Sequence, residues 1–393
     1  MSAAAAKTTI ASRSARAAAW TAGSRVLARL FQLASSLVLT RLLVPQDFGL
    51  MAQAAVLLQM LQLISDLGVQ TALVQLPRGH NRRYLNAAFA LSILRSAGLF
   101  CICLLMAAPF AAFYDEDRLH ALISLLAISI LLQGFENPAY ALLIKNLAAR
   151  KQARFETAVA GATVALTVGF TLYERSVWAL ALGSLSGVLL RVLGTHLLIP
   201  VRFRLRAIDP AVLRRLLAAC GHLLVNTLIT WLALNLDVLA IGRILSMSEL
   251  GLYNIGRNLA LSGELLLVPI IARSYFPAAA ALAREHAEGI RSPECLALYR
   301  QNALLFAGGG ALVQLGLALV AVDLIQLLYP GAYLEAAGVV ALLALRGVLR
   351  TISVLQSGML FAASRTAYET LAMLLSQLVL APGRLHFPSD RGG

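Results

Sequence analysis

The chain has 393 residues, of which 59% are hydrophobic and 13% are charged. A soluble domain is about one quarter charged, so these charges are too few to coat water-soluble domains of this length. The composition argues against a soluble globular enzyme and excludes a disordered chain. It predicts an all-α polytopic membrane protein, with the bilayer as solvent for most of its surface.

Ten apolar runs follow one another along the chain, and each is long enough for a membrane-spanning helix of about 20 residues. They cover residues 18–40, 48–74, 87–110, 119–140, 156–173, 176–199, 212–236, 250–275, 300–322 and 336–361. An eleventh run begins near Ala367 and meets Pro382 before it reaches a full span. We therefore expect 10 or 11 transmembrane helices.

The loops between these runs alternate in charge. One set carries most of the cations: Lys7, Arg13, Arg16, Arg78, Arg82, Arg83, Lys145, Arg150, Lys151, Arg154, Arg202, Arg204, Arg206, Arg214, Arg215, Arg284, Arg291, Arg300 and Arg365. The other set carries four cations and eight acids: Asp47, Asp115, Glu116, Asp117, Glu174, Glu249, Asp323 and Glu335. The positive-inside rule predicts that the basic loops and the N-terminus lie in the cytoplasm. The net charge of +14 is then mainly an orientation signal, and no nucleic-acid partner is expected.

The short loops carry no Walker A, HExxH or GxSxG motif. The six histidines are scattered without the spacing of metal ligands. The sequence therefore predicts neither an enzyme nor a cofactor or metal site.

A short repeat divides the chain. The segment Arg41–Leu50 matches Arg243–Leu252 without gaps at an offset of 202 residues, with arginine, leucine, glycine and an acid at equivalent places. Asp47, and Ser246 with Glu249 as a capping box, are suited to start the helix that follows. Both copies fall between an odd and an even span, which predicts a parallel repeat of six-helix lobes.

We expect four regions from this pattern. They are a cytoplasmic tail over residues 1–17, a first lobe over 18–200, a basic linker over 201–215 and an incomplete second lobe over 216–393.

The repeat and its surroundings resemble a known family. The matching segments are Thr40–Gly49, Ser65–Gly68 with Thr71–Leu73, Leu236–Asn254, and Pro269 with Phe276–Pro277. They are similar to the helix-end signatures of bacterial polysaccharide exporters, or oligosaccharide flippases, in the superfamily that includes the MATE drug exporters and the lipid II flippases. The detail is closest to the branch that exports colanic acid, xanthan and teichuronic acid.

The resemblance covers residues 17–365 and implies twelve or more helices. Because the chain ends inside its eleventh run, we expect a reading frame that is truncated or shifted at its C-terminal end.

Ionisable side chains inside a span are costly, by about 2.5–3.5 kcal/mol each on insertion scales, and are functional hypotheses by default. The runs contain Arg25, Arg29, Asp66, Arg95, Glu136, Arg191, Asp237, Arg257, Glu264, Arg273, Arg346 and Arg350. Cations exceed acids among them, and such groups are expected to face a lumen rather than lipid. We predict a cationic cleft of Arg25, Arg29, Arg95, Arg257, Arg346 and Arg350. Glu264, Asp66 and Asp237 are the candidates for ion coupling.

Simpler roles remain open for several of these residues. Arg25, Arg191 and Arg273 are close enough to the cytoplasmic interface to extend their charge into water. Asp237 could pair with Arg243, and Glu264 could neutralise Arg257. Glu136 is expected to be structural. Gly183 and Gly187, like the glycines at 308–310, predict close packing of helices.

The resemblance implies a function. A flippase of this kind moves a polyprenyl-phosphate-linked oligosaccharide from the cytoplasmic to the outer leaflet of the bacterial inner membrane by alternating access, driven by an ion gradient. The arginine cleft would hold the phosphate. The implied partners are that lipid-linked saccharide, the lipid bilayer, and the polymerase and chain-length machinery of polysaccharide synthesis.

Three alternatives stay open: a MATE-like antiporter of small molecules or ions, a membrane enzyme, and a truncated protein that does not transport.

Overall fold

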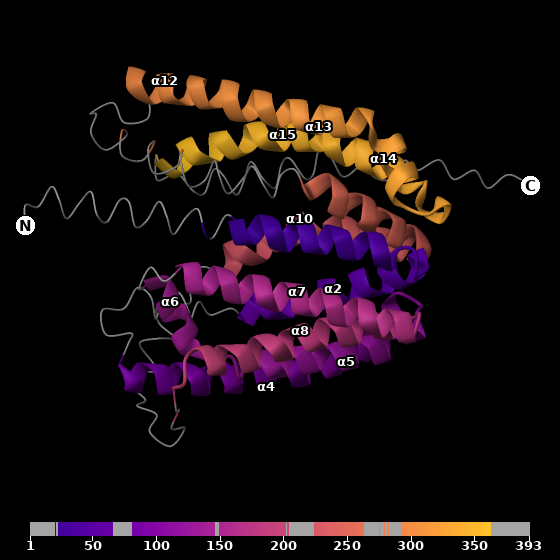
Figure 1. Ribbon diagram of the computed structural model, residues 1–393, viewed down its shortest axis with the longest axis vertical. Helices are drawn as coiled ribbons and strands as arrows, with labels where there is room; N and C mark the ends of the chain where they lie inside the picture. Colours follow the sequence, from indigo (N-terminus) through magenta and orange to yellow (C-terminus); the bar gives the residue numbers. More distant parts are fainter. Residues whose placement is uncertain are drawn as a thin grey trace, which may run out of the picture. The chain divides into compact units, whose positions relative to one another are not determined.

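The computed structural model describes residues 20, 23–65, 81–145, 149–201, 203, 224–262, 275, 279, 282 and 292–362. Throughout these ranges the regular elements are helices (Figure 1). The chain divides into two compact units, which we call unit 1 (residues 1–43 and 50–228) and unit 2 (residues 44–49 and 229–393). Asp66 and Glu264, two of the predicted coupling residues, lie outside the described residues. The predicted boundaries of tail, lobes and linker stay a prediction.

Unit 1 is built on long helices that pack side by side (Figure 1). They are a helix over residues 23–39, most of α2 (Pro45–Ser65), α4 (Arg82–Phe113), α5 (Asp117–Gln133), η1 (Pro138–Tyr140), α6 (Ala141–Lys145), α7 (Ala149–Tyr173) and α8 (Val177–Leu198). α4 packs on α5, α5 on α8, and α7 on α8. A tight turn joins α4 to α5, with Asp115 in the left-handed region at φ 52°.

Four helices of the described residues are long and apolar enough to cross a bilayer: Arg82–Phe113, Arg150–Tyr173, Val177–Leu198 and Pro293–Leu319. Each corresponds to a predicted span. The predicted fourth span, residues 119–140, is too long by several residues, because α5 ends at Gln133. Pro138 then begins a short 3₁₀ turn, capped by the Asn137 side chain, which accepts a hydrogen bond from the Ala139 N–H.

The predicted glycine packing in the sixth span is confirmed. A side chain on Gly183 would overlap Thr167 of α7, and one on Gly187 would overlap Thr163. Gly308 and Gly309, in contrast, have no described atom within 4 Å of an added Cβ. The expectation of close packing was therefore wrong for these two residues. The chain around them forms a π-helix, η4 (Ala303–Gly308).

Replacing Gly187 by valine is expected to push α7 away from α8. Overpacking of this kind costs about 1–3 kcal/mol, because Thr163 lies directly opposite and its own hydroxyl is held by the Val159 carbonyl at 2.8 Å. Thermal unfolding of the purified protein, followed by size-exclusion chromatography, should show a lower Tm. Gly169 on α7 is the matched control, since no described atom lies within 4 Å of its added Cβ. An equal loss of Tm in Gly169→Val would contradict the packing argument.

Unit 2 contains a second set of helices (Figure 1). They are most of α10 (Leu224–Ile244), a helix over residues 247–262, α12 (Pro293–Asn302), η4, α13 (Gly309–Leu319), α14 (Ala321–Leu328), η5 (Gly331–Tyr333) and α15 (Ala336–Ala362). The predicted capping box starts the helix over residues 247–262. The Glu249 N–H donates to Ser246 Oγ at 3.2 Å, and the Ser246 N–H donates to Glu249 Oε2 at 2.7 Å.

The two copies of the repeat meet inside unit 2. A Cβ on Gly49 would overlap the backbone carbonyl of Met247, and a Cβ on Gly251 would overlap the backbone carbonyl of Pro45. Pro45 and Met247 occupy equivalent places in the repeat, so the contact is reciprocal. The beginning of α2 and the beginning of the helix over residues 247–262 therefore cross at their glycines, where any side chain would separate them.

Two aromatic side chains lie beside this crossing. The Phe48 ring meets the Tyr333 ring edge to face, with 6.1 Å between centroids. Burial raises the pKa of Tyr333, and the nearby Asp47 carboxylate raises it further. Tyr333 is therefore a neutral phenol that packs residues 44–49 against η5 within unit 2.

Candidate functional site

The predicted cleft residues of unit 1 lie on two helices. Arg25 is exposed and Arg29 is half-buried on the helix over residues 23–39, and Arg95 is half-buried on α4. Arg29 Nη1 donates to Gln32 Oε1 at 2.6 Å, one turn along the same helix. Their joint membership of a cleft stays a prediction.

Unit 2 joins two of the predicted site residues directly. Arg257 Nε lies 3.7 Å from Asp237 Oδ2, and the Tyr253 hydroxyl donates to the same carboxylate oxygen at 2.5 Å. The other oxygen, Asp237 Oδ1, accepts from the Val238 N–H at 3.0 Å. Asp237 is 4% exposed, so its charge is balanced inside the protein rather than by water. The sequence suggested Arg243 as a partner for Asp237 and Glu264 as a partner for Arg257, whereas the structure pairs Asp237 with Arg257.

The other two predicted cleft residues of unit 2 lie on α15, next to the helix that carries Arg257. The two helices touch at Gly256, where an added Cβ would lie 2.9 Å from Cβ of Val339. Arg346 and Arg350 follow Val339 on α15, about 10 and 16 Å further along at 1.5 Å per residue. Both are half-buried. Three arginines therefore lie along two neighbouring helices of unit 2.

A buried amide accompanies these arginines. Gln314 on α13 is 0% exposed and packs against Gly347 of α15, between Arg346 and Arg350 in sequence. Among the described residues, neither its amide nitrogen nor its amide oxygen has a hydrogen-bond partner. An unpaired buried polar group costs about 1–3 kcal/mol, so a hydrogen-bond partner from outside the described residues would stabilise the Gln314 amide. Sequence reasoning missed it because only ionisable groups were considered, although any polar residue in an apolar run carries the same signal.

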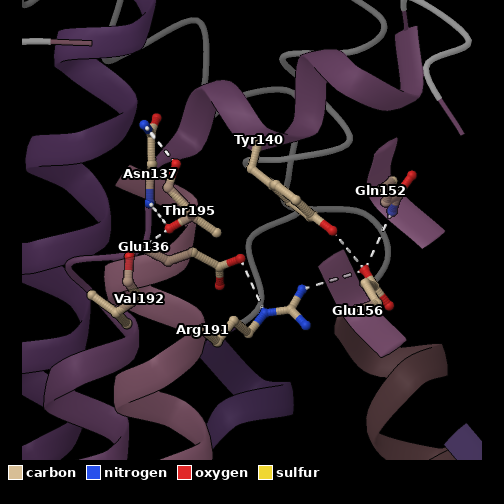
Figure 2. Close-up of polar contacts among 8 residues, drawn as sticks. All are labelled: Glu136, Asn137, Tyr140, Gln152, Glu156, Arg191, Val192 and Thr195. Atoms are coloured by element: carbon tan, nitrogen blue, oxygen red, sulfur yellow. Dashed lines mark hydrogen bonds and ion pairs between the residues drawn. The ribbon is translucent and has the colours of Figure 1, made fainter. Parts of the chain in front are cut away.

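Unit 1 contains a charged network that the sequence did not reveal (Figure 2). Arg191 Nε on α8 donates to Glu136 Oε1 at 3.2 Å, and Arg191 Nη2 lies 3.8 Å from Glu156 Oε1 on α7. The same Glu156 oxygen accepts from the Tyr140 hydroxyl at 2.9 Å and from Gln152 Nε2 at 3.3 Å. The Arg191 guanidinium also lies 5.6 Å from the centre of the Tyr140 ring.

This network ties the short segment after α5 to α7 and α8. Asn137 strengthens the tie, because its Nδ2 donates to the Ile199 carbonyl at 2.7 Å and its backbone N–H donates to Thr195 Oγ1 at 3.3 Å. Glu136 therefore has the structural role expected of it. Arg191 is held between two carboxylates and is not simply extended toward the interface. Glu156 was not predicted, because it stands at the first residue of its apolar run.

Chemically, the described residues differ between the two units. The Arg191 network has two acids for one arginine, so its cation is already neutralised. In unit 2 Asp237 faces Arg257, while Arg346 and Arg350 are two further cations on a neighbouring helix and Gln314 adds an amide. Unit 2 is therefore the better candidate for binding an anionic, hydroxyl-rich ligand.

Comparison with known proteins places this arrangement in context. The model of the "Polysaccharide biosynthesis protein" family matches residues 38–337. An uncharacterised membrane protein in the cps region of Klebsiella pneumoniae is 22% identical over 341 residues, which are 85% of this chain and 68% of that protein.

Two further relatives have names that state a function. The lipopolysaccharide biosynthesis protein WzxC of Escherichia coli is 24% identical over 88% of this chain and 70% of its own. The succinoglycan biosynthesis transport protein ExoT of Rhizobium meliloti is 24% identical over 61% of this chain and 48% of its own. Among solved structures, an inward-facing multidrug resistance MATE family transporter of the MOP superfamily matches with a TM-score of 0.72 at 14% identity, over 91% of this chain and 86% of that one. This likeness supports the all-α polytopic membrane fold.

Proposed function

The chain belongs to the polysaccharide biosynthesis protein family, and we propose that it is a flippase that carries a polyprenyl-phosphate-linked oligosaccharide across the membrane. Two relatives are named for lipopolysaccharide biosynthesis and for succinoglycan transport, which supports a saccharide cargo. The protein would act as a secondary transporter without bond chemistry of its own. The membrane would be the bacterial inner membrane, with the N-terminus in the cytoplasm, and the polymerase would receive the product.

The observation that carries this proposal is a group of three arginines in unit 2. Arg257, Arg346 and Arg350 lie along two neighbouring helices, and Asp237 is the acid that faces Arg257. Arginine keeps its charge when partly desolvated and can bind two phosphate oxygens at once. Gln314 would hydrogen-bond a hydroxyl of the sugar. Arg25, Arg29 and Arg95 would be the cations that the first lobe contributes to the phosphate-binding cleft.

Arg257 and Asp237 offer a link between cargo and coupling. A substrate phosphate that binds Arg257 competes with Asp237 for the same guanidinium. The released carboxylate then lacks its counter-charge, which the coupling cation would supply. Asp66 and Glu264 would be further coupling acids. Cargo binding and ion binding would in this way favour one another, as alternating access driven by a gradient requires.

Loss of the Arg350 charge is expected to reduce polymer export about tenfold or more, since a hydrogen bond to a charged group contributes about 1.5–3 kcal/mol. The measurement is surface polysaccharide in a host strain that lacks its own flippase and expresses Arg350→Gln. Arg118→Gln is the matched control, because Arg118 is an exposed cation of the α4–α5 turn region. Normal export by Arg350→Gln at equal protein level would remove Arg350 from the site.

A MATE-like antiporter is the second candidate, because the solved MATE transporter shares the fold. Its cargo would be small organic cations, which the arginines of unit 2 would repel. Transport of such cations into vesicles that contain the purified chain would favour it over the flippase.

A further inference from the structure

A groove in unit 1 has no part in the proposed site. It has a volume of about 550 Å³ and lies between Trp20 with the beginning of the helix over residues 23–39 on one side and the beginning of α7 on the other. Trp20 and Leu27 line one side, and Ala153, Arg154, Thr157 and Ala158 of α7 line the other. The two helices come together beyond the groove, where an added Cβ on Gly161 would lie 3.4 Å from the Phe31 ring. The groove is therefore formed where the two helices separate.

The walls of this groove are mostly apolar, with Ser24 as a polar residue on one side and Arg154 and Thr157 on the other. Ala153 and Ala158 leave room along the α7 side, and Leu27, which is 40% exposed, faces the opening with a large apolar side chain. Exposed apolar side chains are ordinary where they meet hydrocarbon. The groove would therefore favour contact with a hydrocarbon chain over contact with a free ionic solute.

The cations at the beginning of α7 have different surroundings. Arg150 lies over the Trp20 ring, 5.3 Å from its centre, and Lys151 Nζ donates to the Leu198 carbonyl at the end of α8 at 3.4 Å. Arg154 is exposed and lines the groove, and in the described part of the chain it forms neither a hydrogen bond nor an ion pair. α7 has no acid in its first turn. The dipole of the helix does not favour cations here, so Arg154 does not serve to stabilise α7.

The two faces of α7 separate two kinds of arginine site. Gln152 and Glu156 point into the network in which Arg191 is already neutralised (Figure 2). Residues 153, 154, 157 and 158 line the groove instead. The groove therefore combines an unneutralised guanidinium with an apolar wall, which is the complement of a phosphate on a hydrocarbon chain.

We infer that this groove binds the lipid end of the cargo, with the phosphate at Arg154 and the first isoprenoid units along Leu27 and Ala158. The inference rests on the proposed function, and it adds a lipid-binding place in unit 1 that is separate from the arginines of unit 2. Trp20 is suited to the level of the lipid headgroups. In the proposed orientation this is the cytoplasmic side, where the lipid-linked saccharide has to be collected.

The test uses a polyprenyl phosphate that carries a photoreactive group near its phosphate. The purified full chain is placed in vesicles of neutral phosphatidylcholine, irradiated and mapped by peptide mass spectrometry. The expected label falls on residues 20–27 and 150–158. Arg154→Gln should lower labelling of these peptides about fivefold or more, while Arg82→Gln, which removes an exposed cation from the beginning of α4, should leave it unchanged. Unlabelled polyprenyl phosphate should compete, and the uncharged polyprenol should not.

Three results would overturn the inference. Label confined to other peptides would place the lipid elsewhere. Equal labelling of Arg154→Gln and wild type would remove the phosphate contact. Equal competition by phosphatidylglycerol would show that the groove holds bulk anionic lipid.

The proposed function is judged by a separate readout. A labelled groove in a chain that exports no polymer would leave the groove standing and reject the flippase. Normal export with label outside the groove would reject the groove and leave the flippase standing. If the wild-type chain takes up no label at all in the neutral vesicles, the groove is rejected, and export alone decides on the flippase.

Discussion

Alanine at Gly251 is expected to abolish polymer export, although it adds a single methyl group. The added Cβ would overlap the backbone carbonyl of Pro45. A backbone carbonyl cannot rotate away as a side chain can, so the crossing of the two repeat copies has to open. In a helix, alanine is otherwise more favourable than glycine by about 1 kcal/mol. A loss of function in Gly251→Ala would therefore come from the crossing and not from a weaker helix.

The crossing also predicts how two such changes combine. Gly49→Ala should have the same effect, because its Cβ would overlap the Met247 carbonyl. The double variant should lose little more than either single variant, since both open the same contact. Gly338→Ala on α15 is the control, because no described atom lies within 4 Å of its added Cβ, and it should export normally. Export by Gly251→Ala at the level of Gly338→Ala would show that the crossing is not required.

The second large effect is expected at the Arg257–Asp237 pair. Arg257→Gln leaves the Asp237 carboxylate buried without its cation, and removal of one partner of a buried pair costs about 3–5 kcal/mol. The Arg257 side chain is 17% exposed and that of Asp237 2%, so solvent screening is weak. We expect a marked fall in Tm together with loss of export.

The double variant separates stability from transport. Asp237→Asn with Arg257→Gln removes both charges, so the Tm should recover most of its value. Export should stay absent, because the guanidinium that would bind the substrate phosphate has been removed. Arg257→Lys should keep the Tm and export weakly, since an ammonium group lacks the planar fork of arginine. Arg300→Gln, at an exposed cation of α12, controls for loss of charge. Full export by the double variant would assign the pair to folding alone.

Much of the fold could be predicted from the sequence. The apolar runs at residues 87–110, 176–199 and 336–361 correspond to α4, α8 and α15, because a bilayer requires long apolar helices whatever they pack against. The capping box at Ser246 was also predicted correctly, since it depends on a short stretch of chain. The glycines at 183 and 187 were predicted correctly because small residues in a spanning helix are typical of close helix packing. The end of α5 was predicted wrongly, because the turn at Pro138 continues the apolar run without continuing the helix.

The candidate site was less predictable. The sequence named Asp237 and Arg257 as separate candidates, one for coupling and one for the cleft, and the structure places them in one ion pair. It did not point to Glu156 or Tyr140, because partners more than a few turns apart along the chain are chosen by packing. The same holds for the groove at Arg154, which needs two helices to separate. The sequence reasoning did not point to Gln314, because only ionisable groups were considered.

By itself, the sequence determined that this protein is a helical membrane protein, and its repeat and helix-end motifs determined the family. The first follows from composition and periodicity, and the second from the resemblance of short motifs to those of the family; both can be recognised one segment at a time. The tertiary structure decided which charges neutralise one another, which amide is buried without a partner, and that the two repeat copies meet at their glycines. These are contacts between distant segments, and their energies depend on distances that no single segment specifies.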